Sequence, residues 1–191
     1  MPGRDLNRMP PPIEECTGWL ARPLRDSIAY IIKNARKGVK CPCCFQIVKL
    51  RQRKFNAGMA ATLVAMWAET LRRERQGNRD PWIHVEHQLV EKGLAPKRCR
   101  DFSQMRYLGL IESKARMTRT TGPDANDTGF YKVTTLGRHV CENPRRPLIR
   151  KYMLTFDNGV HGFEGPEISL KQALGDRFDF QELVCGEKIA A

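Results

Sequence analysis

The sequence predicts an α+β protein in which helices and strands alternate through a central region at residues 57–142. Three observations predict this class. Apolar residues recur at helical spacing in some segments and at strand spacing in others, glycine and proline separate these segments, and the composition of 41% hydrophobic and 28% charged residues is typical of globular chains. We therefore expect four parts: a flexible leader at 1–15, a helix with a cysteine turn at 16–56, the central domain, and a β-hairpin with C-terminal helices at 143–191.

The N-terminal parts contain prolines, one helix and a group of cysteines. Three consecutive prolines that begin at Pro10 favour extended backbone, so we expect a flexible leader. From Thr17 to Lys37 apolar residues recur at helical spacing, and Gly38 is placed to end that helix. Cys41 to Phe55 is typical of a tight cysteine turn followed by a strand, in a small hairpin-like module.

The central domain has the clearest succession of elements. Asn56 is placed to cap its first helix, and Gly93 and Gly109 are placed to end its second and third helices. A long polar loop separates the two strands that follow. The predicted order is helix, short strand, helix, helix, strand, strand, helix, at residues 57–74, 82–85, 86–92, 97–108, 110–116, 129–134 and from 135 onward.

This order is that of a winged helix-turn-helix domain, and the residues around the two strands resemble that family. Met105 to Glu112 (MRYLGLIE) resembles the end of the recognition helix and the start of the wing in bacterial and phage winged-helix proteins. Gly129 to Gly137 (GFYKVTTLG) resembles the strand that returns from the wing. With its CPxC-like turn before this domain, the layout also resembles small phage-encoded proteins of uncharacterised function. The resemblance implies that the third helix contacts DNA.

The C-terminal segment is predicted to contain a hairpin and short helices. Two strand-like segments, 151–156 and 160–163, flank an Asn-Gly pair that suits a tight turn. Ser169 and Asp179 are placed to cap the helices that follow. We expect this segment to pack onto the central domain or to join two copies of the chain.

The net charge of +12 is the strongest compositional indication of a partner. Such a chain attracts polyanions, and nucleic acid is the leading candidate; the alternative is that the charge only keeps the protein soluble. Residues 33–54 hold eight Lys or Arg and no acid, and residues 92–119 hold eight with two acids. Residues 155–191 instead hold three basic and seven acidic residues. The chain therefore has a basic body and an acidic tail.

The third predicted helix carries the residues that we expect to contact base pairs. Helical spacing puts Cys99, Phe102 and Met105 on a packing side and leaves a polar side for the major groove, where Arg can bond guanine and Gln can bond adenine. The alternative is an ordinary solvated helix face. The expected nucleic-acid contacts are Arg100, Ser103, Gln104 and Tyr107 on the polar side, the flanking Lys97, Arg98 and Arg106, and Lys114, Arg116 and Arg119 on the wing.

The cysteine turn is a candidate for half of a zinc site. Cys41 and Cys44 have the C-x-x-C spacing that lets two thiolates share a tetrahedral Zn²⁺ ion. No second zinc knuckle is recognisable, and Phe45 stands where such knuckles often have glycine, so buried or idle thiols are the alternative. His84 and His87 are expected to be structural. The seven cysteines, an odd number, form no disulfide framework and indicate a reducing cytosol.

These features predict a basic protein that binds double-stranded DNA, as a regulator of transcription in a phage or mobile element. Catalysis lacks candidate residues, because the acidic pairs have no partner nucleophile or metal cluster and no glycine loop would cradle a phosphate. No apolar stretch approaches the roughly 20 residues of a membrane span, so the cytoplasm is the expected location. Two alternatives stay open: an adaptor whose winged helix captures a host protein, and an accessory protein of nucleic-acid processing.

Overall fold

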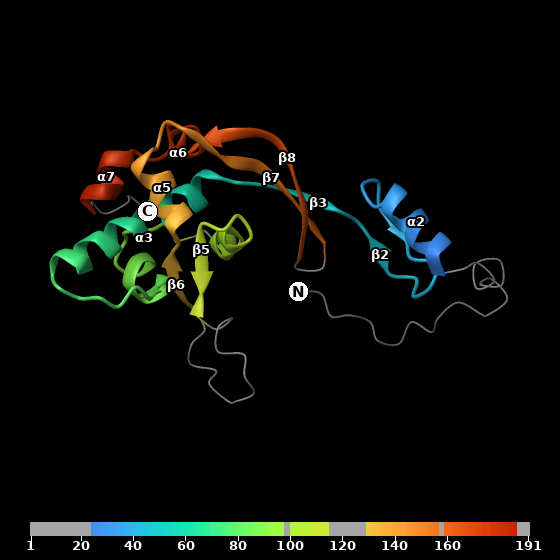
Figure 1. The fold of residues 1–191 in the computed structure, drawn as a ribbon, viewed down its shortest axis with the longest axis horizontal. Helices are drawn as coiled ribbons and strands as arrows, with labels where there is room; N and C mark the ends of the chain where they lie inside the picture. The colour runs from blue at the N-terminus through green and yellow to red at the C-terminus, as the bar shows by residue number, and fades with distance from the viewer. Residues whose placement is uncertain (1–23, 98–99, 115–128, 157–158, 187–191) are drawn as a thin grey trace, which may run out of the picture. The chain divides into compact units, whose positions relative to one another are not determined.

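The computed structural model describes residues 24–97, 100–114, 129–156 and 159–186, in which helices and strands are mixed as the sequence predicts (Figure 1). The chain divides into two compact units. The N-terminal unit comprises Met1–Gln52 and Leu154–His161, and the central unit comprises Arg53–Met153 and Gly162–Ala191. Most of the segment expected as a separate C-terminal part therefore belongs to the same unit as the central domain.

The N-terminal unit contains a helix and a two-stranded hairpin. Helix α2 (Leu24–Asn34) is followed by Gly38, which has φ +89° and terminates the turn after the helix. Strand β1 (Val39–Lys40) pairs antiparallel with β2 (Ile47–Val48), so the cysteine turn connects the two strands. The strand expected after this turn is shorter than predicted. The predicted start of the helix at Thr17 lies outside the described residues.

Helix α3 (Ala57–Arg75) begins the central unit as predicted. Asn56 caps it, because its side-chain oxygen accepts a hydrogen bond from the Met59 N–H at 2.9 Å. Every residue from Met59 to Met66 is buried. The one polar residue in that stretch, Thr62, donates its hydroxyl hydrogen to the Gly58 carbonyl at 2.8 Å. This part of α3 therefore lies inside the unit on all its faces.

A three-stranded antiparallel sheet forms from segments on either side of the predicted polar loop. Strands β4 (Ile83–His84), β5 (Ile111–Ser113) and β6 (Phe130–Val133) lie in the order β4-β6-β5, so the last strand is central. Ile83 pairs with Tyr131 and is fully buried. The sequence predicts all three strands, although β5 is shorter than expected.

Two helices between β4 and β5 differ in type from the α-helices that the sequence predicts. η2 (Glu86–Val90) is a π-helix, and η3 (Arg100–Arg106) is a 3₁₀ helix. The expectation of an α-helix over 97–108 is therefore wrong. Residues three apart share one edge of a 3₁₀ helix, and Phe102 and Met105 have that spacing. Packing both side chains against the unit favours the tighter helix.

Helix α5 (Thr135–Glu142) packs closely on the residue that precedes β5. Thr134 caps the helix by accepting a hydrogen bond from the Gly137 N–H at 3.0 Å. A Cβ atom at Gly137 would lie 2.2 Å from the carbonyl oxygen of Leu110 and 2.9 Å from Val133 Cγ1. The approach of α5 to this backbone therefore requires glycine.

The hairpin predicted near the C-terminus is present, and both of its strands are longer than predicted. Strands β7 (Pro147–Phe156) and β8 (Gly159–Ser169) are neighbours in a sheet of order β3-β7-β8, in which β3 is Arg51–Lys54. The turn residues Asp157 and Asn158 lie outside the described residues. The sequence shows basic residues after the cysteine turn, at the position of β3. It does not predict that this strand pairs with β7.

Two short helices complete the central unit (Figure 1). α6 (Leu170–Leu174) begins with a capping box of Ser169 and Gln172. α7 (Phe180–Cys185) begins at Asp179, whose carboxylate accepts hydrogen bonds from two backbone N–H groups. The sequence predicts both capping residues. Helix α3 is the centre of the unit, because five elements contact it: helices α5, α6, α7 and η3 and strand β6.

We expect Gly137→Ala to destabilise the central unit by about 3 kcal/mol, because the added methyl group collides with the Leu110 backbone. The accompanying gain in helix propensity is at most about 1 kcal/mol. Thermal denaturation measures the loss. Thr135→Ala, at an exposed position of the same helix, is the control and should change Tm little. Equal Tm values for the two variants would contradict the close packing.

Candidate nucleic-acid interface

The candidate interface is built on η3, which is attached to the sheet by its apolar edge. Met105 is fully buried, and the Phe102 ring meets the Tyr131 ring edge-on with 5.1 Å between centroids. After η3 the chain continues in turns closed by hydrogen bonds between residues three apart, and Gly109 at φ +70° leads into β5. The polar residues of η3 therefore lie on its two remaining edges.

The 3₁₀ geometry changes which polar residues share an edge. An α-helix would align Ser103 and Gln104 with Arg100 and Tyr107, whereas a 3₁₀ helix aligns residues three apart. Ser103 thus shares an edge with Arg106. Gln104 shares one with Asp101, and its Nε2 donates to Asp101 Oδ1 at 3.4 Å. This carboxylate beside a proposed reading residue was not predicted, although its three-residue spacing from Gln104 is visible in the sequence.

Arg106 and Tyr107 form a stacked pair at the end of η3. The guanidinium carbon of Arg106 lies 4.8 Å from the centre of the Tyr107 ring, and the guanidinium also donates to the Tyr107 hydroxyl at 2.9 Å. Arg106 Nε is buried without a hydrogen-bond partner. These contacts hold the planar guanidinium along the ring rather than in solvent.

The strands next to η3 carry their own charges. Lys114, directly after β5, lies with its ammonium group 5.4 Å from the centre of the Phe130 ring. Glu112 and Lys132 are opposite each other in the β5–β6 register and form an ion pair at 2.8 Å. The Glu112 carboxylate is a second acidic group that was not predicted at the interface.

The structure describes the side chains of six of the ten predicted contact residues. Four of them are half-buried on η3 or directly after it: Ser103, Gln104, Arg106 and Tyr107. Lys114 is half-buried after β5, and Lys97 is exposed in the turn before η3. Arg100 begins η3, and nothing is described of its side chain. Arg98, Arg116 and Arg119 lie outside the described residues.

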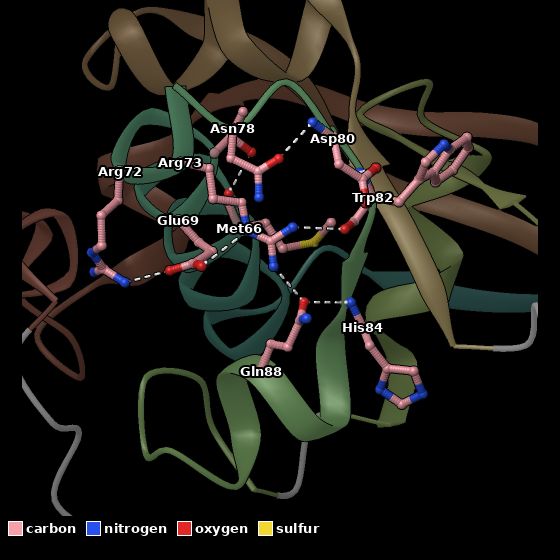
Figure 2. A network of polar contacts seen from close by, with 10 residues as sticks. Met66, Glu69, Arg72, Arg73, Asn78, Asp80, Trp82, His84 and Gln88 are labelled. Atoms are coloured by element: carbon pink, nitrogen blue, oxygen red, sulfur yellow. Dashed lines mark hydrogen bonds and ion pairs between the residues drawn. The ribbon is translucent and has the colours of Figure 1, made fainter. Parts of the chain in front are cut away.

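A polar network on α3 holds β4 and η2 in place (Figure 2). The Arg73 guanidinium contacts Glu69 Oε1 at 3.1 Å, the Trp82 carbonyl at 2.8 Å and Gln88 Oε1 at 2.7 Å. Gln88 Oε1 also accepts from the His84 N–H at 2.9 Å. One arginine side chain thus connects the last turns of α3 with the strand and helix that follow.

The two histidines of this region contact each other. The His84 and His87 rings stack with 4.2 Å between centroids, and His84 Nδ1 accepts from the His87 N–H at 3.3 Å. His87 Nδ1 also lies 2.7 Å from a carboxylate oxygen of Glu91. In the part of the chain that the structure describes, no three Cys, His, Asp or Glu side chains form a group that could hold a metal ion.

The cysteine turn belongs to the N-terminal unit. Cys41 is buried, whereas Cys43 and Cys44 are exposed. The pKa of the Cys41 thiol is lowered, and the backbone N–H of Cys44 contributes most to this. Burial raises the pKa, whereas hydrogen bonds from Cys43 and from the Cys44 thiol lower it further. By contrast, burial raises the pKa of Cys141 in α5, which keeps that thiol protonated.

Comparison with protein-family models, curated proteins and solved structures gave no match to this chain. No helix among the described residues is long and apolar enough to cross a membrane.

We expect Tyr131→Ala to loosen η3, because the Phe102 ring loses its edge-on partner. The loss for this half-buried ring is about 2 kcal/mol. Hydrogen exchange of the η3 backbone amides measures the local effect, and Tyr131→Phe, which keeps the ring, is the control. Equal exchange rates in the two variants would show that the ring contact does not hold η3.

Proposed function

We propose that residues 57–142 form a winged helix-turn-helix domain that binds duplex DNA. The observation that carries the proposal is the strand order β4-β6-β5 together with a short helix, η3, directly before β5. In winged-helix proteins the third helix enters the major groove and the following strand pair forms the wing beside it. The elements α3, β4, η2, η3, β5 and β6 follow each other in the order that this domain requires.

The distribution of charge supports DNA as the ligand. Residues 92–119 hold eight basic residues and two acidic ones, and the whole chain has a net charge of +12. Lysines at both ends of the candidate interface, Lys97 and Lys114, suit phosphate contacts, and Ser103 and Gln104 suit contacts to base edges. The proposed biological role is regulation of transcription in a phage or mobile element, in the cytoplasm.

The 3₁₀ helix restricts how much sequence the domain reads. η3 has seven residues, and its inner edge is occupied by packing against the sheet. Only two short edges carry polar groups, and one of them includes the Asp101 carboxylate, which repels phosphate. We therefore propose that phosphate contacts supply most of the affinity and that base contacts are few.

We expect the double variant Lys97→Ala/Lys114→Ala to weaken duplex binding about tenfold at moderate salt and to reduce the slope of log K against log salt by about 2. Fluorescence anisotropy with labelled duplex and single-stranded DNA over a salt series measures both. Arg145→Ala/Arg146→Ala, at exposed positions after α5, removes the same charge and is the control.

Equal losses in the two double variants would show that net charge alone drives binding. If Arg100→Ala and Gln104→Ala leave both affinity and sequence preference unchanged, η3 is not the reading helix.

We expect Asp101→Asn to increase duplex affinity about threefold, because it removes a negative charge from the edge that carries Gln104. Glu142→Gln, at an exposed position of α5, makes the same change in charge elsewhere and should alter affinity less. The same anisotropy titration compares the variants. An unchanged affinity in Asp101→Asn would place this edge away from the DNA.

A protein-binding adaptor is the second candidate function, and a cavity favours it. A hollow of about 330 Å³ lies between the end of η3, at Tyr107 to Leu110, and strands β7 and β8. Leu148 and Phe163 line it, and Phe163 is 45% exposed. Such an apolar hollow fits a side chain of a partner protein. A partner that is retained after nuclease treatment and lost in Phe163→Ala would favour this function over DNA binding.

A further inference from the structure

The described part of the N-terminal unit buries few apolar side chains. Among its described residues, the buried hydrophobic ones are Ala35, Val39 and Cys41, all of them small. Larger side chains are exposed instead, Ile32 at 71% and Ile47 at 76%. A small unit without a larger core usually needs a cross-link, such as a disulfide or a bound metal ion. The described residues of this unit therefore bury little apolar surface, and a cross-link among them would add stability.

The backbone of the cysteine turn is strained for its sequence. Phe45 has φ +59°, in the left-handed region that bulky residues rarely adopt. Hydrogen bonds hold it there: the Cys41 N–H donates to the Gln46 carbonyl at 2.7 Å, and the Phe45 N–H donates to the Cys41 carbonyl at 2.9 Å. A conformation of this kind is strained and is typical of functional sites. The missing glycine therefore does not prevent the knuckle conformation.

The hairpin fixes both ends of the turn. Lys40 pairs with Ile47 in the β1–β2 register, and the Cys41 N–H donates to the Gln46 carbonyl directly beside that pair. The backbone therefore keeps the two cysteines of the C-x-x-C spacing, Cys41 and Cys44, within one tight turn.

We propose that Cys41 and Cys44 are thiolate ligands of one structural Zn²⁺ ion that stabilises the N-terminal unit. Their C-x-x-C spacing suits two corners of a tetrahedral site, and each thiol releases its proton to solvent when it binds the ion. Since no group of three candidate ligands occurs among the described residues, the other ligands come from the rest of the chain or from a second copy. The site is independent of the proposed DNA interface, which lies in the central unit.

The test measures metal directly in the full-length protein. The wild-type chain and the variants Cys41→Ser and Cys44→Ser are purified in reductant, loaded with Zn²⁺ and freed of unbound ion, and elemental analysis gives zinc per chain. We expect about one ion per chain, or one per two chains in a dimer, and at least about tenfold less in either variant. Both ratios support the two ligands. Zinc loss in Cys16→Ser would place a further ligand in the same chain.

Two controls separate zinc binding from general effects of losing a thiol. Cys185→Ser, at an exposed thiol in α7, and Cys43→Ser should keep their zinc. Co²⁺ in place of Zn²⁺ should give sulfur-to-metal charge-transfer absorption that Cys41→Ser lacks. Limited proteolysis within residues 24–52 should accelerate in Cys41→Ser and in chelator-treated wild type. Equal zinc in wild type and both ligand variants, or a Cys41–Cys44 disulfide that persists in reductant, would overturn the proposal.

Discussion

The central unit depends on the burial of helix α3. Because every residue from Met59 to Met66 is buried, other elements must cover this helix on all sides, and helices α5, α6, α7 and η3 and strand β6 do so. Burial of side chains such as Leu63 and Met66 contributes about 1.5–3 kcal/mol each. Where α3 becomes polar, Arg73 replaces apolar packing with hydrogen bonds to β4 and η2. The position of the candidate interface follows from this burial, because η3 and β6 are among the elements that cover α3.

The sequence predicts the starts of helices well, because capping is local chemistry. Asn56, Thr134, Ser169 and Asp179 each precede a helix and each accept backbone hydrogen bonds, as their side chains suggest. The three short strands of the central unit are predictable for a similar reason, since glycine or proline separates them from their neighbours. The pairing of β3 with β7 is not predictable in this way. This pairing joins residues that are far apart in the sequence, such as Arg51 and Thr155, whose hydroxyl donates to the Arg51 carbonyl at 3.1 Å.

The candidate site is less predictable than the fold, because its geometry depends on the type of helix. Periodicity identifies Met105 as a packing residue in either an α-helix or a 3₁₀ helix, and it is fully buried. The 3₁₀ helix places Gln104 directly in line with Asp101, whereas an α-helix would offset the two around the helix axis. The Phe102 ring of this helix packs on Tyr131, which is distant in the sequence. A face of a short helix is thus fixed by tertiary packing, and sequence spacing alone does not determine it.

The two units use different means to remain folded while carrying much positive charge. The central unit places its cations around a large apolar core, and carboxylates pair with several of them, as Glu69 does with Arg73. The basic run of the N-terminal unit extends into β3, an edge strand in which all four residues are exposed and three are basic. Charged side chains on an edge strand hinder pairing with other chains, so these cations protect the sheet whether or not they bind phosphate. They cannot replace an apolar core, however, because like charges repel each other. A cross-link at the cysteine turn would add cohesion to this unit without reducing its positive charge on the exposed strand.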